Sequence, residues 1–212
     1  MKPLSDCRLY AFVDTAYLRG RAPEVVARQL CDGGADLIQL RAKQSSPDAI
    51  RRMAEAILSI TRQANVGLVI NDHLSIAEAV GADFCHLGQE DFFDAGHKRC
   101  SEVRSLKSEV RIGLSTHAPE QARRALAAGP DYIAIGPVYA TGTKPTAKPV
   151  TLECVRWAEA NVAIPWFAIG GINLSNLGDV LAAGAQRICV VSAILNADNV
   201  AKACAEYRKR LG

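Results

Sequence analysis

Short apolar runs, each ended by a polar residue or a glycine, recur along the chain about every 25 residues, the length of a strand plus a helix. The run-ending residues are Asp14, Gln39 to Lys43, Asn71 and Asp72, Gln89 to Asp91, Ser115, Gly136, Gly170 and Gly171, and Ser192. The pattern therefore predicts eight strands. If the strands are parallel and close into a barrel, all eight ends meet on one rim.

Two features of the pattern favour parallel strands. Runs such as 67–70 and 188–191 are continuously apolar, which is typical of strands covered on both faces. Helical spacing lies between the runs, as in 50–58, where Ser46 is a predicted N-cap and Pro47 the first helical residue. We predict an α/β fold, a single-domain (β/α)8 TIM barrel over residues 1–212, and keep a doubly wound open sheet as the alternative.

Composition limits the choice of function class. The 212 residues carry a net charge of +3 and no basic stripe with interleaved aromatics, which argues against nucleic acid as a partner. The N-terminus has no apolar signal region and no apolar stretch approaches the roughly 20 residues of a membrane helix, so we expect a cytoplasmic chain without membrane contact. The seven cysteines form no C-x-x-C pair, which predicts neither disulfides nor a zinc site. A homo-oligomer is left open.

The predicted end of the second strand carries two cations. Arg41 and Lys43 are two residues apart and project to the same side of an extended chain. An arginine beside a lysine suits a phosphate or diphosphate, although a solvated strand end would give the same short pattern.

Carboxylates follow the third and fourth predicted strands, at Asp72 and at Glu90 and Asp91. Magnesium is commonly held by one or two carboxylates together with substrate phosphates. Each aspartate could instead be the N-cap of the next helix. Because the strands are neighbours in a barrel, we favour a metal site.

The last two predicted strands are followed by glycine and serine. Gly170, Gly171 and Ser192 stand where TIM barrels hold a phosphate, at the loops after strands seven and eight and the N-terminus of a short helix. A pair of tight turns is the alternative. The unpatterned segment 136–150 predicts a binding loop or lid, equipped for oxyanions by Thr141, Thr143 and Lys144.

Together these segments resemble the thiamine phosphate synthase family over nearly the whole chain. The matching stretches are QLRAK at 39–43, IND at 70–72, HLGQED at 86–91, GLSTH at 113–117, DYIAIGPVYATGTK at 131–144, AIGGI at 168–172 and VVSAI at 190–194. The resemblance implies a (β/α)8 barrel that joins a hydroxymethylpyrimidine diphosphate to a thiazole phosphate. The implied products are thiamine phosphate and pyrophosphate, formed when the thiazole nitrogen captures a pyrimidine-methyl cation.

The resemblance also implies roles for individual residues. Asp72 and Asp91 would carry Mg²⁺, the implied cofactor, and the catalytic residues would be Arg41, Lys144 and Ser115. The pyrimidine diphosphate would be held by Gln39, Leu40, Arg41, Ala42, Lys43, Asn71, Ser115 and Lys144. The thiazole phosphate would be held by Thr141, Gly142, Thr143, Gly171, Val191 and Ser192.

Two departures and two alternatives accompany this interpretation. The family commonly has Glu where this chain has Ala42, whose side chain we expect to point away from the ligand. The stretch 145–153 also differs from the family, and Lys148 could share the work of Lys144. A related thiazole tautomerase would not need the cations and acids of the rim. A non-catalytic barrel that binds a phosphorylated metabolite and regulates a partner protein is the other alternative.

Overall fold

The strands of this chain form one closed barrel. The structure is a computed structural model that describes residues 1–142 and 148–212. Eight strands pair in parallel in the order of the sequence, and β1 pairs with β8 to close the ring. The strands are β1 (Leu9–Asp14), β2 (Leu37–Arg41), β3 (Gly67–Asn71), β4 (Phe84–Gly88), β5 (Arg111–Thr116), β6 (Tyr132–Ile135), β7 (Trp166–Ile169) and β8 (Ile188–Cys189). The predicted (β/α)8 barrel is confirmed, and the open sheet is wrong.

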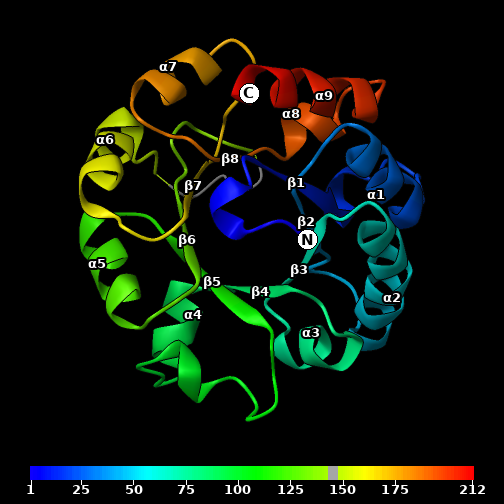
Figure 1. The fold of residues 1–212 in the computed structure, drawn as a ribbon, viewed down its shortest axis with the longest axis horizontal. Helices are drawn as coiled ribbons and strands as arrows, with labels where there is room; N and C mark the ends of the chain where they lie inside the picture. The colour runs from blue at the N-terminus through cyan, green and yellow to red at the C-terminus, as the bar shows by residue number, and fades with distance from the viewer. Residues whose placement is uncertain (143–147) are drawn as a thin grey trace.

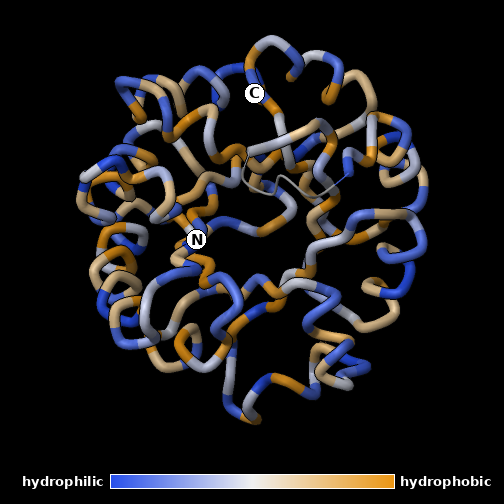
Figure 2. Tube along the Cα trace, turned by 180° about the vertical axis from the view of Figure 1, so that it is seen from behind, coloured by the Kyte–Doolittle hydropathy of each residue, from blue (hydrophilic) through white to orange (hydrophobic). Residues whose placement is uncertain are grey.

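Helices form a ring outside the strands (Figure 1). They are α1 (Pro23–Asp32), α2 (Pro47–Gln63), α3 (Leu74–Val80), α4 (Gln89–Asp94), α5 (Pro119–Ala127), α6 (Thr151–Asn161), α7 (Leu177–Ala182), α8 (Ser192–Leu195) and α9 (Val200–Leu211), with the 3-10 turns η1 (Leu4–Asp6), η2 (Thr15–Tyr17) and η3 (Cys100–Glu102). Along the helices, hydrophilic and hydrophobic residues alternate within each turn, as the blue and orange stretches of the trace show (Figure 2). None of the helices described here is long and apolar enough to cross a membrane.

The start of α2 follows from its sequence. The Ser46 side chain accepts a hydrogen bond from the Ala49 N–H at 3.3 Å, and Pro47 occupies the first helical position, as predicted. The apolar positions Ile50, Ala54 and Ile57 face the barrel and are buried. One amphipathic stripe therefore fixes this helix against the sheet.

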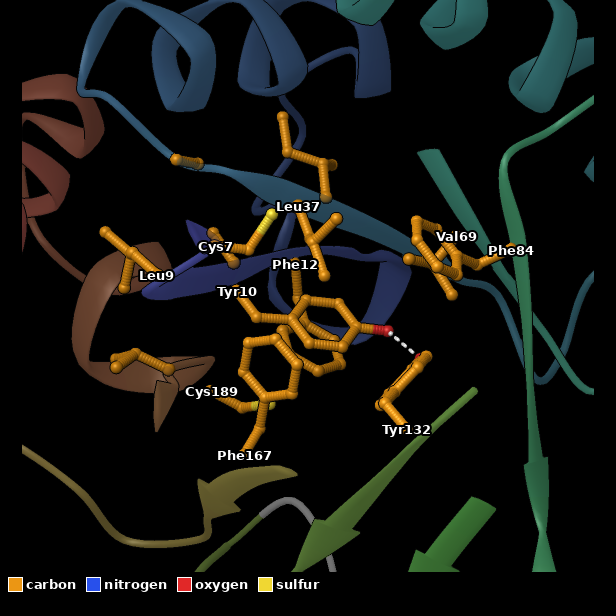
Figure 3. Packing of buried hydrophobic residues seen from close by; sticks show 14 of the residues in the cluster. Cys7, Leu9, Tyr10, Phe12, Leu37, Val69, Phe84, Tyr132, Phe167 and Cys189 are labelled. Carbon is orange, nitrogen blue, oxygen red and sulfur yellow. Dashed lines mark hydrogen bonds between the residues drawn. The ribbon is translucent and has the colours of Figure 1, made fainter. Parts of the chain in front are cut away.

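Aromatic rings fill the barrel interior. Tyr10, Phe12, Phe84, Tyr132 and Phe167 are buried and pack edge to face or stacked, with centroids 5.1–6.1 Å apart. Figure 3 shows Tyr10 and Tyr132 meeting at their hydroxyl groups among these rings.

Glycine on one strand makes room for this cluster. A Cβ at Gly113 on β5 would clash with the ring of Tyr132 on β6. The glycine of the GLSTH stretch therefore serves packing of the core.

At the amino ends of the strands, three aspartates join neighbouring strands by the same pair of hydrogen bonds. Asp36, Asp83 and Asp131 stand directly before β2, β4 and β6. Each donates its backbone N–H to a carbonyl of the preceding strand and accepts the N–H of that same residue with its carboxylate. The residues that exchange these bonds are Leu9, Leu68 and Ile112, whose N–H groups lie 2.9, 2.9 and 2.7 Å from the carboxylate oxygens. Each carboxylate thus adds one rung to the ladder and fixes the register there.

The N-terminal segment crosses this end of the barrel (Figure 1). Lys2 pairs with Asp36 at 2.5 Å, and the Arg187 guanidinium donates to the Ser5 carbonyl at 2.7 Å. Cys7 is fully buried beneath the segment, and burial raises its pKa to about 11. This cover leaves the carboxyl ends of the strands as the open rim.

The eighth strand is shorter than the sequence indicates. β8 ends at Cys189, although the apolar run continues to Val191. Val190 still donates to the Tyr10 carbonyl at 3.0 Å, but the backbone then bends and α8 begins at Ser192. The apolar residues that follow the strand thus line the turn into α8.

We expect Asp83→Ala to lower the free energy of unfolding by about 1–3 kcal/mol, because the buried Leu68 N–H loses its acceptor. The exposed Asp198 supplies the matched control, and Asp198→Ala should change that free energy by less than about 0.5 kcal/mol. Urea unfolding of both variants measures the difference. Equal stability of the two would contradict the register role of the aspartate.

Candidate active site

The open rim surrounds a cavity of about 640 Å³ to which all eight strands or their following turns contribute. The side chains that the sequence places at the strand ends meet there. From the first four strands the lining includes Phe12, Gln39, Arg41, Lys43, Asn71, Asp72, His86, Gly88 and Asp91. From the last four it includes Ser115, His117, Ala134, Gly136, Thr141, Gly142, Ile169, Gly171, Cys189, Val191 and Ser192.

Strand alternation decides which residues of 39–43 face the cavity. Gln39, Arg41 and Lys43 line it, whereas Leu40 and Ala42 are buried elsewhere, with 1% and 5% exposure. The period of two in an extended strand accounts for this division. Ala42 points away from the cavity as expected, and so does Leu40, so a substrate contact by either would have to come from the backbone.

The acidic side of the cavity is built around Asp72. Its backbone has φ 65°, a conformation that non-glycine residues seldom adopt, and its N–H donates to the His86 carbonyl at 2.9 Å. Its carboxylate accepts from the Asn71 amide at 2.6 Å and lies 3.5 Å from the Lys43 ammonium. The N-cap of α3 is His73, so the alternative interpretation of Asp72 as a helix cap is wrong.

Asp91 lies in the first turn of α4 and folds back on the strand end. A Cβ at Gly88 would lie 2.8 Å from its Oδ2 atom, so the glycine leaves room for the carboxylate. Among the described residues no three His, Cys, Asp or Glu side chains gather as a metal cluster. Two carboxylates on one cavity wall suit Mg²⁺, a hard cation that takes oxygen ligands and completes its shell with waters and substrate phosphates.

The opposite wall holds the glycine pair. Gly170 and Gly171 have φ 99° and 66°, and the carbonyls of Ile169 and Gly170 accept from Val138 and Tyr139 at 2.8 and 3.0 Å. A Cβ on Gly171 would lie 2.7 Å from the Ala140 carbonyl oxygen. The pair therefore fits against the loop after β6.

Next to this pair, α8 begins after the two residues that follow the end of β8. Ser192 is its first residue and lines the cavity. The first N–H groups of a helix have no acceptor within the helix, so those at the start of α8 are available to an anion in the cavity. Thr141 and Gly142 of the neighbouring loop also line the cavity. Thr143 and Lys144 lie outside the described residues, and Lys148 is exposed.

A buried chain of polar groups under the cavity was not predicted from the sequence. The Gln39 amide donates to the Tyr10 hydroxyl at 2.5 Å, which lies 3.1 Å from the Tyr132 hydroxyl, and His86 Nδ1 lies 3.1 Å from that second hydroxyl. Burial raises the pKa of both tyrosines well above the usual value, so both hydroxyls stay protonated. Tyrosines inside otherwise apolar strands were the signal that could have found this chain.

The loop after β6 has one more anchor that the sequence did not reveal. The imidazole Nδ1 of His117 contacts the Gly136 carbonyl, and the His117 backbone N–H donates to the Gln121 side chain at 2.7 Å. His117 thereby links the end of β5 to the start of the loop that carries Thr141 and Gly142.

Comparison with known proteins connects this arrangement to one family. The model of a family described as thiamine monophosphate synthase matches residues 9–194. A thiamine-phosphate synthase of Lawsonia intracellularis is 38% identical over 97% of this chain and 93% of its own length. One of Thermus thermophilus is 44% identical over 84% of each chain.

A solved structure agrees with the sequence matches. Thiamine phosphate pyrophosphorylase from Pyrococcus furiosus superposes with a TM-score of 0.82 at 29% identity, covering 98% of this chain and 96% of its own. Both the fold and the sequence are therefore shared over most of the chain. On this evidence, the chain belongs to the thiamine monophosphate synthase family.

Proposed function

We propose that this enzyme condenses a hydroxymethylpyrimidine diphosphate with a thiazole phosphate, giving thiamine phosphate and pyrophosphate. The observation that carries the proposal is the distribution of charge in one cavity. Arg41, Lys43, Asp72 and Asp91 line one cavity, in which Lys43 lies 3.5 Å from Asp72. A glycine-lined wall with a helix N-terminus follows β7 and β8. One cavity thus offers places for a metal-bound diphosphate and for a second phosphate.

The pyrimidine diphosphate is assigned to the wall formed by β2, β3 and β4. Arg41 and Lys43 are the donors for the diphosphate oxygens, and Asn71 and Ser115 line the cavity beside them. Gln39 lies deeper, where its amide is held by Tyr10, which suits hydrogen bonding to the edge of an aminopyrimidine ring. By resemblance, Lys144 completes this set from the loop after β6.

Asp72 and Asp91 would hold Mg²⁺ in this arrangement. When bound, the ion would neutralise charge on the diphosphate and so assist its departure. Lys43 lies 3.5 Å from Asp72, and both side chains are partly exposed, so this pair can rearrange when the diphosphate binds.

The thiazole phosphate is assigned to Gly171, Val191, Ser192, Thr141 and Gly142, all of which line the same cavity. By resemblance, Thr143 joins them. Backbone N–H groups at glycines and at a helix start bind phosphate without a bulky side chain between them and the anion. The two anion sites lie on different walls, which leaves the space between them for the two rings.

The chemistry asks for charge stabilisation more than for a nucleophile. The C–O bond to the diphosphate breaks, the diphosphate leaves with the electron pair, and the thiazole nitrogen donates its lone pair to the pyrimidine methylene carbon. Arg41 and Lys144 would stabilise the charge that grows on the leaving group. Burial raises the pKa of the Cys189 thiol in the cavity wall well above its usual value, so it is poorly suited to nucleophilic attack.

Neither alternative function gains support from the cavity. A thiazole tautomerase would leave the cations and carboxylates of β2, β3 and β4 without a role, yet they line the cavity together. A regulatory barrel that only binds a phosphorylated metabolite would leave the carboxylates of Asp72 and Asp91 without a role.

Mixing both phosphorylated substrates with the protein and Mg²⁺ tests the proposed function. We expect stoichiometric release of pyrophosphate and thiamine phosphate, measured by a coupled phosphate assay and by fluorescence after oxidation to thiochrome. Omitting either substrate is the control. Conversion of the thiazole substrate without pyrophosphate release would favour a tautomerase, and binding without conversion would favour a regulatory barrel.

We expect Asp91→Asn to raise the Mg²⁺ concentration for half-maximal activity by about tenfold or more, because one of two carboxylates is lost. Asp94→Asn changes an exposed carboxylate on the same helix that does not line the cavity, and should leave the value within about twofold. Magnesium titrations of both variants measure the effect. Unchanged magnesium dependence of Asp91→Asn would remove this residue from the metal site.

We expect Gly171→Ala to raise the KM for the thiazole phosphate about tenfold, since its positive φ and its contact with the Ala140 carbonyl leave no room for a Cβ. The KM for the pyrimidine diphosphate should change by less than about twofold. Gly178→Ala is the matched control, because a Cβ there meets no atom within 4 Å. An effect on the pyrimidine substrate alone would reverse the assignment of the two sites.

A further inference from the structure

Asp14 is a buried carboxylate beside the active site whose role the family assignment does not explain. It is the last residue of β1 and pairs in register with Arg41, the last residue of β2. Its exposed fraction is 1%, and it does not line the cavity, whereas Arg41 does. Asp14 therefore stands behind Arg41 when viewed from the cavity.

Both oxygens of the Asp14 carboxylate are occupied. Oδ1 accepts the Ala16 N–H at 3.0 Å, which fixes the carboxylate to the turn after β1. Oδ2 accepts from Nη1 of Arg41 at 2.8 Å. The backbone thus orients the carboxylate, and the carboxylate orients the guanidinium.

The second cation of the site is held differently. The Lys43 ammonium lies 3.5 Å from Asp72, and its side chain is 52% exposed, against 15% for Arg41. An exposed pair at that distance is loose and is screened by water and salt. Arg41 is therefore a fixed donor, and Lys43 is an adjustable one.

We propose that Asp14 is a positioning residue that holds the Arg41 guanidinium ready for the diphosphate. The inference rests on the proposed function, because Arg41 has this role only if a diphosphate binds. A guanidinium presents several N–H donors in one plane, so the carboxylate that takes one of them also sets the direction of the others. Preorganised donors need no reordering when charge develops on the leaving group.

Asp36, which stands directly before β2, supplies a matched control. Like Asp14, Asp36 is buried, and its carboxylate accepts the backbone N–H groups of Arg8 and Leu9 at 2.6 and 2.9 Å. It also pairs with a cation, Lys2, but at the closed end of the barrel. Asp36→Asn removes the charge that pairs with Lys2 and weakens comparable hydrogen bonds without changing a residue that lines the cavity.

The test is a double-mutant cycle on Asp14 and Arg41, measured by steady-state kinetics. We expect Asp14→Ala to raise the KM for the pyrimidine diphosphate and lower kcat, each about tenfold, with the thiazole phosphate KM within twofold. In an Arg41→Met background, Asp14→Ala should change kcat/KM by less than twofold, because the group it positions is gone. Asp14→Asn, which is similar in size, should also raise the pyrimidine diphosphate KM and lower kcat, but by smaller factors. Asp36→Asn should leave the KM values of both substrates within twofold.

Pyrophosphate binding in the presence of Mg²⁺, followed by calorimetry, gives a readout that does not depend on turnover. We expect about tenfold weaker binding by Asp14→Ala and unchanged binding by Asp36→Asn. Tighter binding by Asp14→Ala would show that the carboxylate merely repels the anion, and fully multiplicative effects with Arg41→Met would show a general structural role. Either result overturns the proposal. A wild-type protein that binds pyrophosphate but forms no product would instead contradict the proposed function.

Discussion

The register between neighbouring parallel strands is the constraint on which this site depends. Gln39, Arg41 and Lys43 face the cavity only because β2 keeps its present pairing with β1 and β3. A slip of one residue would exchange the two faces of a strand and point Leu40 and Ala42 inward. At the closed end of the barrel, Asp36 adds one rung to this pairing through two hydrogen bonds that it exchanges with Leu9. Five register pairs join β1 and β2, so their whole paired length, and no single rung, sets which side chains face the cavity.

Local pattern was sufficient to predict eight parallel strands, their common rim and part of the cavity lining, including Arg41, Lys43, Asp72 and Asp91. Apolar runs report burial, and alternation within 39–43 reports which side chains share a face. The N-cap Ser46 was likewise visible, because capping involves residues only three positions apart. Family resemblance then supplied the roles of the rim residues, which pattern alone left open.

The remaining features depend on contacts between distant segments. Tyr10 and Tyr132 are 122 residues apart, and Asp14 and Arg41 are 27 apart, so neither pair shares a local period. The requirement for glycine at 171 comes from the loop after β6 as well as from its own φ, and only the folded chain brings the two together. β8 was overestimated because apolar residues also line the turn that follows it.

The three aspartates before β2, β4 and β6 divide the barrel into units of two strands and two helices. Each follows a glycine of positive φ two residues earlier, at 34, 81 and 129. Before β8 the corresponding position is Arg187, whose side chain has only hydrogen-bond donors and so cannot accept a backbone N–H as the aspartates do. In a closed barrel one pair of neighbouring strands is not consecutive in the sequence, and here that pair is β8 and β1. Arg187 instead donates to the Ser5 carbonyl, so the segment before β1 holds the start of β8 in place.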